Sequence, residues 1–180
     1  PRCGPVHLNF PRNILANVCQ FDEIQKHKLE NLPTVNEKNL INILKIINKA
    51  KKPVIIAGGG VKNSLSHETV LKISTYLNIP IVASAGHGDV IPFDELLYAG
   101  QMGPRGNPIA SELVKNADVI LALGTRLGFN STFYSYDNIN KEAKIIQVDI
   151  DNISLGRYFP ITLGICNDVK DLTEKLLIKV

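Results

Sequence analysis

The chain has 180 residues, 44% of them hydrophobic, and a formal net charge of +3 at pH 7. This size and composition are typical of one globular domain, and no apolar run approaches the roughly 20 residues that cross a membrane, so we expect no membrane association. The positive charge comes from scattered lysines without interleaved aromatic residues, which does not favour nucleic-acid binding. Widely separated cysteines predict reduced cytoplasmic thiols rather than a disulfide framework or zinc site: Cys3, Cys19 and Cys166.

The start of the chain differs from the rest in its pattern. Residues 5–10 alternate apolar and polar side chains as a strand does, and Pro11 ends that pattern. Residues 13–33 are polar and have no sustained period, which predicts a linker. The sequence begins with neither Met nor an apolar signal region, so we interpret it as the middle of a longer protein.

From residue 35 onward, short β-branched runs alternate with amphipathic stretches of helical length. Helical spacing begins near Asn36, which can cap the first turn, and recurs in later stretches: 64–77, 108–116 and 169–178. Four apolar runs end abruptly in glycine or acid: 53–60, 79–86, 119–126 and 145–151. A shorter run at 161–165 predicts a fifth strand. Two segments between these elements are predicted as irregular loops: 86–106 and 128–142.

Continuous β-branched runs of this kind are typical of a parallel sheet that is buried on both faces. Their alternation with helices predicts an α/β fold, a doubly wound, mostly parallel sheet of about six strands with helices on both faces, similar to a Rossmann domain. In such sheets ligands bind just beyond the carboxyl ends of the strands. The residues that follow each run are therefore the candidate site.

Glycines and an arginine follow the first and third runs. Residues 58–60 are glycines between a strand and a helix, where a backbone either turns tightly or approaches a phosphate. Both alternatives stay open, because Asn63 replaces the third glycine of the dinucleotide-binding fingerprint. At the end of the third run, Gly124 lets a ligand come close, and Arg126 either binds a diphosphate or pairs with a neighbouring carboxylate.

Two aspartates and a histidine complete the candidates. Asp149 ends the fourth run, where a carboxylate can accept hydrogen bonds from a ribose, whereas Asp151 is better explained as a turn cap. His87, in the glycine-rich loop after the second run, is either a catalytic base or, as we favour, a structural or solvent-facing residue, because no nucleophile accompanies it. We predict no catalytic group and no metal site within this chain.

Together these stretches resemble one family, the central domain of thiamine-diphosphate-dependent enzymes of the acetolactate synthase group. The similarity covers nearly the whole chain and depends on the order and spacing of its segments: 4–12, 52–60, 117–127, 143–151 and 164–170. Within the group, Leu121–Leu127 and Gly164–Cys166 are most similar to sulfoacetaldehyde acetyltransferase, with acetolactate synthase next.

The resemblance implies a three-domain enzyme for acyl transfer or carboligation, a cytoplasmic homodimer or homotetramer. Thiamine diphosphate and Mg²⁺ would be held by flanking pyrimidine-binding and diphosphate-binding domains, and the chemistry would be that of the cofactor. Residues 1–12 would be the tail of the preceding domain, 13–35 a linker and 36–180 the central, non-catalytic domain.

The central domains of some relatives carry FAD or ADP. The positions that match their contacts in this sequence are Gly59, Gly60, Met102, Gly103, Gly124, Arg126, Asp149, Ile150, Asp168 and Val169. Because Leu127–Asn130 replace the charged residues that grip the cofactor in the flavin enzymes, the resemblance leaves FAD, ADP and no nucleotide as alternatives.

Two other classes of protein share this architecture. A stand-alone FAD- or ADP-binding module, such as an electron-transfer flavoprotein domain, would give residues 4–12 no role. An NAD-consuming deacylase would need a catalytic histidine and usually a zinc site, and His87 alone does not supply them. The sequence therefore favours the central domain of a thiamine-diphosphate enzyme.

Overall fold

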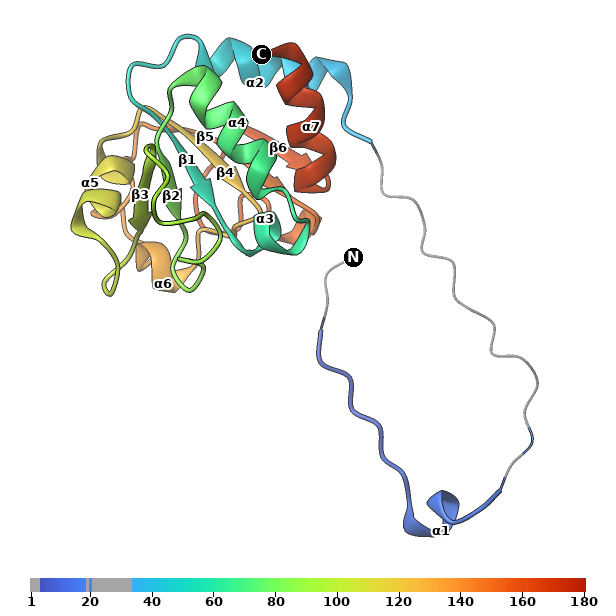
Figure 1. Cartoon of the computed structure of the whole chain (residues 1–180). Helices are drawn as coiled ribbons and strands as arrows, with labels where there is room; N and C mark the ends of the chain where they lie inside the picture. Colours follow the sequence, from blue (N-terminus) through green and yellow to red (C-terminus); the bar gives the residue numbers. More distant parts are fainter. Residues whose placement is uncertain (1–3, 19, 21–33) are drawn as a thin grey trace. The chain divides into compact units, whose positions relative to one another are not determined.

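The computed structural model describes residues 4–18, 20 and 34–180 of two units, one ending at residue 32 and the other beginning at residue 33 (Figure 1). In the first unit, residues 4–11 form no strand with any described residue, and a short helix follows, α1 (Arg12–Leu15). The apolar side chains of the strand-like pattern are exposed: Val6, Leu8 and Phe10. Most of the predicted linker, residues 19 and 21–33, lies outside the described residues.

A sheet of six parallel strands in the order β3-β2-β1-β4-β5-β6 forms the centre of the second unit. The strands are β1 (Pro53–Ala57), β2 (Ile81–Ala83), β3 (Tyr98–Gln101), β4 (Val119–Leu123), β5 (Lys144–Asp149) and β6 (Leu163–Cys166). The central strands β1 and β4 pair over their whole length, from Pro53 opposite Val119 to Ala57 opposite Leu123. Their β-branched runs are buried on both faces, which confirms the predicted doubly wound α/β fold.

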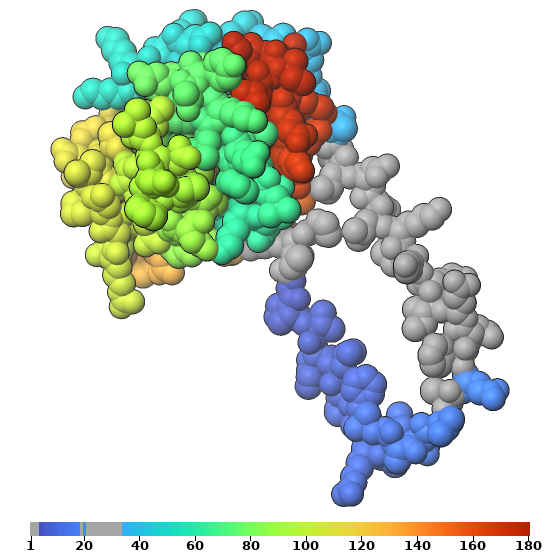
Figure 2. All heavy atoms as spheres, viewed as in Figure 1, coloured from blue at the N-terminus to red at the C-terminus, as the bar shows by residue number. Residues whose placement is uncertain are grey.

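Helices cover both faces of this sheet. On one face α2 (Glu37–Ile47), α4 (His67–Leu77) and α7 (Val169–Lys179) pack on alternate strand residues such as Ile55 and Leu121, and Figure 2 shows these helices against one another. On the other face α5 (Pro108–Asn116) and later loops pack on the intervening residues, such as Ile56. Each fully buried aliphatic side chain contributes about 1.5–3 kcal/mol relative to exposure, so the two cores together hold the sheet in place.

Side-chain caps fix where two of the helices begin, and a left-handed residue ends a third. Asn36 Oδ1 accepts the N–H of Asn39 at 2.8 Å at the start of α2, as predicted. Asn107 caps α5 in the same way, with Pro108 at the first helical position. The last turn of α4 is closed by Asn78, whose left-handed backbone (φ +52°) is typical of a helix C-terminus.

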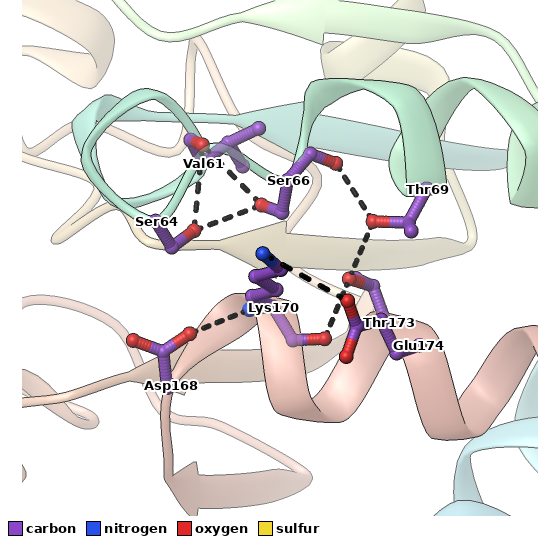
Figure 3. A network of polar contacts seen from close by, with 8 residues as sticks. All are labelled: Val61, Ser64, Ser66, Thr69, Asp168, Lys170, Thr173 and Glu174. Carbon is purple, nitrogen blue, oxygen red and sulfur yellow. Dashed lines mark hydrogen bonds and ion pairs between the residues drawn. The ribbon is translucent and has the colours of Figure 1, made fainter.

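Hydroxyl groups connect the region after β1 to α7 (Figure 3). The short helix α3 (Gly59–Asn63) leads into α4, and Ser66 Oγ donates to Val61 O at 3.3 Å. Across the helix interface, the hydroxyls of Thr69 and Thr173 lie 2.8 Å apart. Ser66 and Thr173 are buried, where an unpaired hydroxyl would cost about 1–3 kcal/mol. These pairs therefore hold α3 and α4 in a defined position against α7.

The prediction of irregular loops at 86–106 and 128–142 was wrong in part, because each segment contains a short strand or helix. Strand β3 lies within the first, and its residues Tyr-Ala-Gly-Gln include no β-branched side chain. It is an edge strand whose pairing with β2 is irregular between Ile81 and Ala83, so no continuous apolar run marks it. Helix α6 (Phe129–Thr132), in the second, is too short for a helical period to be visible.

Asp118 joins the start of β4 to the turn before β1. Its Oδ2 and Oδ1 accept the backbone N–H groups of Lys51 at 2.6 Å and Lys52 at 2.9 Å. Burial raises the pKa of this carboxyl, but hydrogen bonds from backbone N–H groups, those of Lys51 and Lys52 foremost, together outweigh that effect and leave the pKa below its usual value. The carboxylate therefore stabilises the folded chain as long as it is ionised.

We expect Asp118→Asn to lower the free energy of unfolding by about 1–2 kcal/mol at pH 7, because the amide offers one acceptor to two donors. The difference from the wild type should persist above the unfolded-state pKa of about 3.9 and disappear as the pH falls through the lowered pKa of the folded state. Urea denaturation between pH 3 and 7 measures it, with Asp94→Asn in an exposed loop as the control. An equal loss for both variants would contradict this role.

Candidate functional site

The strand order places the switch point of the sheet between β1 and β4, since the chain moves outward from β1 first through β2 and β3 and then through β4, β5 and β6. In doubly wound sheets ligands bind at the carboxyl ends of the strands beside this point. Here those ends are the glycines 58–60 after β1 and Gly124, Thr125 and Arg126 after β4.

The two chain segments at the switch point rest directly on each other. A Cβ atom built on Gly60 would lie 2.5 Å from Gly124 Cα, and one on Gly58 would collide with Gly124 O. Gly60 N–H donates to Gly124 O at 3.0 Å, and Gly58 N–H donates to Leu123 O at 2.9 Å. Both glycines are thus required by close backbone packing, and these two N–H groups are already hydrogen-bonded within the chain. We call this contact the glycine joint.

Arg126 lies beside the glycine joint with its side chain exposed. Gly124 has φ +58°, a left-handed conformation that turns the chain away from β4. Among the described residues no ion pair or hydrogen bond to the Arg126 guanidinium is formed, so the alternative of a pairing with a neighbouring carboxylate is not observed there. The group is available to a ligand or to another protein surface.

A buried glutamine, which the sequence analysis missed, ties the loops after β4 and β5 together. Gln147 Nε2 donates to Thr125 O and to Ser154 O, each at 3.0 Å, and its Oε1 accepts Gly156 N–H at 2.8 Å. Its signal in the sequence is a single amide inside the run Lys-Ile-Ile-Gln-Val-Asp, where every other buried position is apolar or the terminal acid. The position of the Arg126 loop therefore depends on a side chain of β5.

Asp149, Ile150 and Asp151 lie where β5 ends. Asp149 is mostly buried, and its Oδ1 accepts the N–H of Asp151 at 3.0 Å. Asp151 accepts Ile153 N–H at 3.0 Å and caps the short 3-10 helix η1 (Asn152–Ser154), which confirms its predicted role as a turn cap. The carbonyl of Ile150 accepts from the thiol of Cys166 at 3.6 Å.

Two further candidates lie after β3. Met102 is fully buried in the core beneath α5. Gly103 has φ +100°, donates its N–H to Ser111 Oγ at 3.1 Å, and packs so closely that an added Cβ would lie 2.5 Å from Asn130 O. This glycine therefore joins β3 to α6.

The last two candidates lie at the start of α7. Asp168 caps this helix by accepting Lys170 N–H at 2.7 Å, and Val169 is buried in the core beneath α2, α4 and α7. Like Met102 and Gly103, these two residues have evident structural roles.

His87 lies against the glycine turn. A Cβ built on Gly59 would lie 2.7 Å from His87 Cε1 and 3.0 Å from its Nε2, so the imidazole covers this residue. Two positions further on, Asp89 forms an ion pair with Lys62 of α3, and this hydrogen-bonded pair holds the pKa of Asp89 below its usual value. The favoured structural interpretation of His87 agrees with this packing.

Aromatic side chains gather around α6 and the loop before β6, a cluster that the sequence analysis also missed. The ring centroids of Phe129 and Phe133 lie 5.0 Å apart, and those of Tyr134 and Tyr158 lie 4.4 Å apart. Phe133 and Tyr134 both have left-handed backbones, which cost roughly 1–2 kcal/mol for each non-glycine residue. Aromatic ring contacts contribute about 0.5–1.5 kcal/mol each, which acts against that cost.

Within the described part of the chain, no group of three or more His, Cys, Asp or Glu side chains could hold a metal ion. No helix in that part is both long enough and apolar enough to cross a membrane.

Comparison with known proteins identifies the family. A family model described as "Thiamine pyrophosphate enzyme, central domain" matches residues 40–176. The chain belongs to this family. The matched range includes all six strands, so the whole sheet described above is that of the thiamine pyrophosphate central domain.

Individual relatives support the same family. A probable sulfoacetaldehyde acetyltransferase of Rhizobium meliloti (strain 1021) is 33% identical over 97% of this chain and 30% of its own length, and a sulfoacetaldehyde acetyltransferase of Castellaniella defragrans is 37% identical over 93% and 28%. A probable acetolactate synthase large subunit of Methanocaldococcus jannaschii is 29% identical over 98% and 31%. The chain thus spans about a third of the length of these relatives, and the resemblance to the acetolactate synthase group is confirmed.

Two glycine substitutions, one inside the glycine joint and one outside it, test how tightly the joint is packed. We expect Gly60→Ala to lower the free energy of unfolding by about 1–3 kcal/mol, because its methyl group overlaps the Gly124 backbone. Gly128→Ala should change it by less than about 0.5 kcal/mol, since a Cβ at Gly128 meets no atom within 4 Å. Chemical denaturation of the two variants measures the difference, and similar values would show that the joint is not tightly packed.

Proposed function

We propose that this chain is the central, non-catalytic domain of a thiamine-diphosphate-dependent enzyme that carries out acyl transfer or carboligation, with sulfoacetaldehyde as the acyl source. The observation that carries this proposal is the order of the relatives: those named sulfoacetaldehyde acetyltransferase are 31–37% identical to the chain. Those named acetolactate synthase large subunit are 28–29% identical over 98% of the chain, which makes acetolactate synthesis the second candidate.

In this proposal the chemistry belongs to parts of the enzyme outside the chain. Thiamine diphosphate, bound with Mg²⁺ by a pyrimidine-binding and a diphosphate-binding domain, supplies the carbanion chemistry. The residues of this domain form a rigid support, because a sheet buried on both faces fixes the helices and loops that neighbouring domains contact.

We assign the first residues to the connection with the preceding domain. Residues 1–12 are the tail of the pyrimidine-binding domain, 13–35 the linker and 36–180 the central domain. The alternation of the exposed apolar residues Val6, Leu8 and Phe10 with polar His7 and Asn9 supports this assignment, because it is the pattern of a strand with one apolar face. The parent enzyme is a cytoplasmic homodimer or homotetramer in this proposal.

For a nucleotide at the carboxyl edge, FAD or ADP, we propose contacts from Arg126 to phosphate and from Asp149 to ribose. Arg126 supports this because its guanidinium is exposed, and charge-assisted bidentate contacts suit a diphosphate. The other candidates would shape the carboxyl edge of the sheet around the nucleotide: Gly59, Gly60, Gly124, Met102, Gly103, Ile150, Asp168 and Val169.

The parent enzyme should convert sulfoacetaldehyde and phosphate to acetyl phosphate and sulfite in the presence of thiamine diphosphate and Mg²⁺. Enzymatic detection of acetyl phosphate measures this reaction, with pyruvate as the alternative substrate. Formation of acetolactate from pyruvate would favour the second candidate, and a parent that acts on neither substrate would refute both.

The isolated 180-residue chain should turn over neither substrate under the same conditions. Activity of this chain alone would contradict its assignment as a non-catalytic domain.

A further inference from the structure

The loop between β2 and β3 lies across the glycine turn that opens α3. Its residue His87 is half-buried, and the imidazole lies directly against the position that a Cβ atom of residue 59 would take. A distance of 2.7 Å between that atom and Cε1 is well below the roughly 3.5–4.0 Å of a normal carbon–carbon contact. The surface of Gly59 at this point is therefore already covered by the chain itself.

The loop is fixed on both of its sides. Toward α3, Asp89 forms its ion pair with Lys62. Toward β3, Gln101 Oε1 accepts the N–H of Gly86 at 3.1 Å, and the hydroxyl of Tyr98 donates to Gly88 O at 2.8 Å. Contacts to two different elements thus hold the loop residues on either side of His87.

The loop also carries two successive turns of its own. His87 N–H donates to Ser84 O at 3.0 Å, and Val90 N–H donates to His87 O at 3.1 Å. The backbone on either side of the imidazole is thus held within the loop itself.

We propose that residues 84–90, with His87 at their centre, form a plug that covers the glycine turn at the switch point and keeps phosphate groups away from it. In dinucleotide-binding sheets the pyrophosphate lies on the turn after the first strand and on the N–H groups there. In this chain that turn has no room for a methyl group, and the N–H of Gly60 is held by Gly124 O. The glycine turn as it stands does not fit a diphosphate.

This inference adds to the proposed nucleotide contacts of Arg126 and Asp149, and it rests on that part of the proposed function. A nucleotide at the carboxyl edge would bind only when the His87 loop has moved away from Gly59. Its apparent affinity would then be reduced by the fraction of molecules in which the loop is open. The inference is independent of the reaction that the parent enzyme catalyses.

The contact between Gly59 and His87 can be tested without any ligand, on the full 180-residue chain. Gly59 lies in the first turn of α3, so alanine fits its backbone and only the imidazole opposes it. Gly59→Ala should lower the melting temperature by about 2–4 °C in the wild type and by less than about 1 °C in the His87→Ala background. Equal losses in the two backgrounds would overturn the contact on which the plug depends.

Titration with ADP tests the closure itself. His87→Ala should bind ADP at least about tenfold more tightly than the wild type, and His87→Phe, which keeps a flat ring, should bind like the wild type. His67→Ala, the same change on α4, serves as the control. If His87→Ala binds ADP no more tightly than the wild type, the plug is refuted.

A double variant tests the plug and the nucleotide contacts independently of each other. Arg126→Ala added to His87→Ala should weaken ADP binding again by about tenfold or more, because a charge-assisted contact is lost. If affinity rises on removal of His87 but is insensitive to Arg126, the plug stands and the proposed placement of the phosphate is wrong.

Discussion

The direct contact between the backbone after β1 and the backbone at the end of β4 determines most of what surrounds it. Two parallel strands at the centre of a sheet normally diverge where their loops begin, yet here Gly60 and Gly124 remain in contact beyond the last paired residues. The contact exists because neither residue has a side chain and because Gly60 N–H finds an acceptor in Gly124 O. It sets where α3 begins and in which direction the Arg126 loop leaves the sheet.

The remaining loops at this edge are held by hydrogen bonds and by close backbone packing. Gln147 reaches from β5 to the carbonyl of Thr125, and Gly103 lets the chain after β3 pack on α6. Ala85 N–H donates to Ser131 Oγ, which brings the loop after β2 to the same helix. These contacts give the carboxyl edge of the sheet a defined shape.

Much of the fold could be predicted from the sequence, because its central elements have strong local signals. The β4 residues 119–123 are an unbroken apolar run, and α5 begins at the expected proline after an asparagine cap. Strand β3 and helix α6 were missed since the first is a partly buried edge strand containing Gly100 and the second has only four residues. Their positions follow from tertiary contacts, which a local pattern does not contain.

The candidate site was predictable in its location but less so in its detail. Strand ends meet at one edge of a parallel sheet, so Gly60, Gly124 and Asp149 were correctly expected there. The contact of His87 with Gly59 joins residues 28 positions apart through a loop whose path no periodicity encodes. Loops of this kind determine whether a glycine turn is open to a phosphate or is covered by the protein's own chain.

Hydrogen exchange at the amide of Gly60 tests the central claim most directly. If the glycine joint is packed as described, this amide exchanges much more slowly than a free loop amide, because its N–H is hydrogen-bonded to Gly124 O and lies against the Gly124 backbone. The amide of Gly128, which donates to no described residue, gives the rate of an open loop. Exchange of Gly60 as fast as that of Gly128 would mean that its N–H is free, as in a turn prepared for phosphate, and would contradict the account.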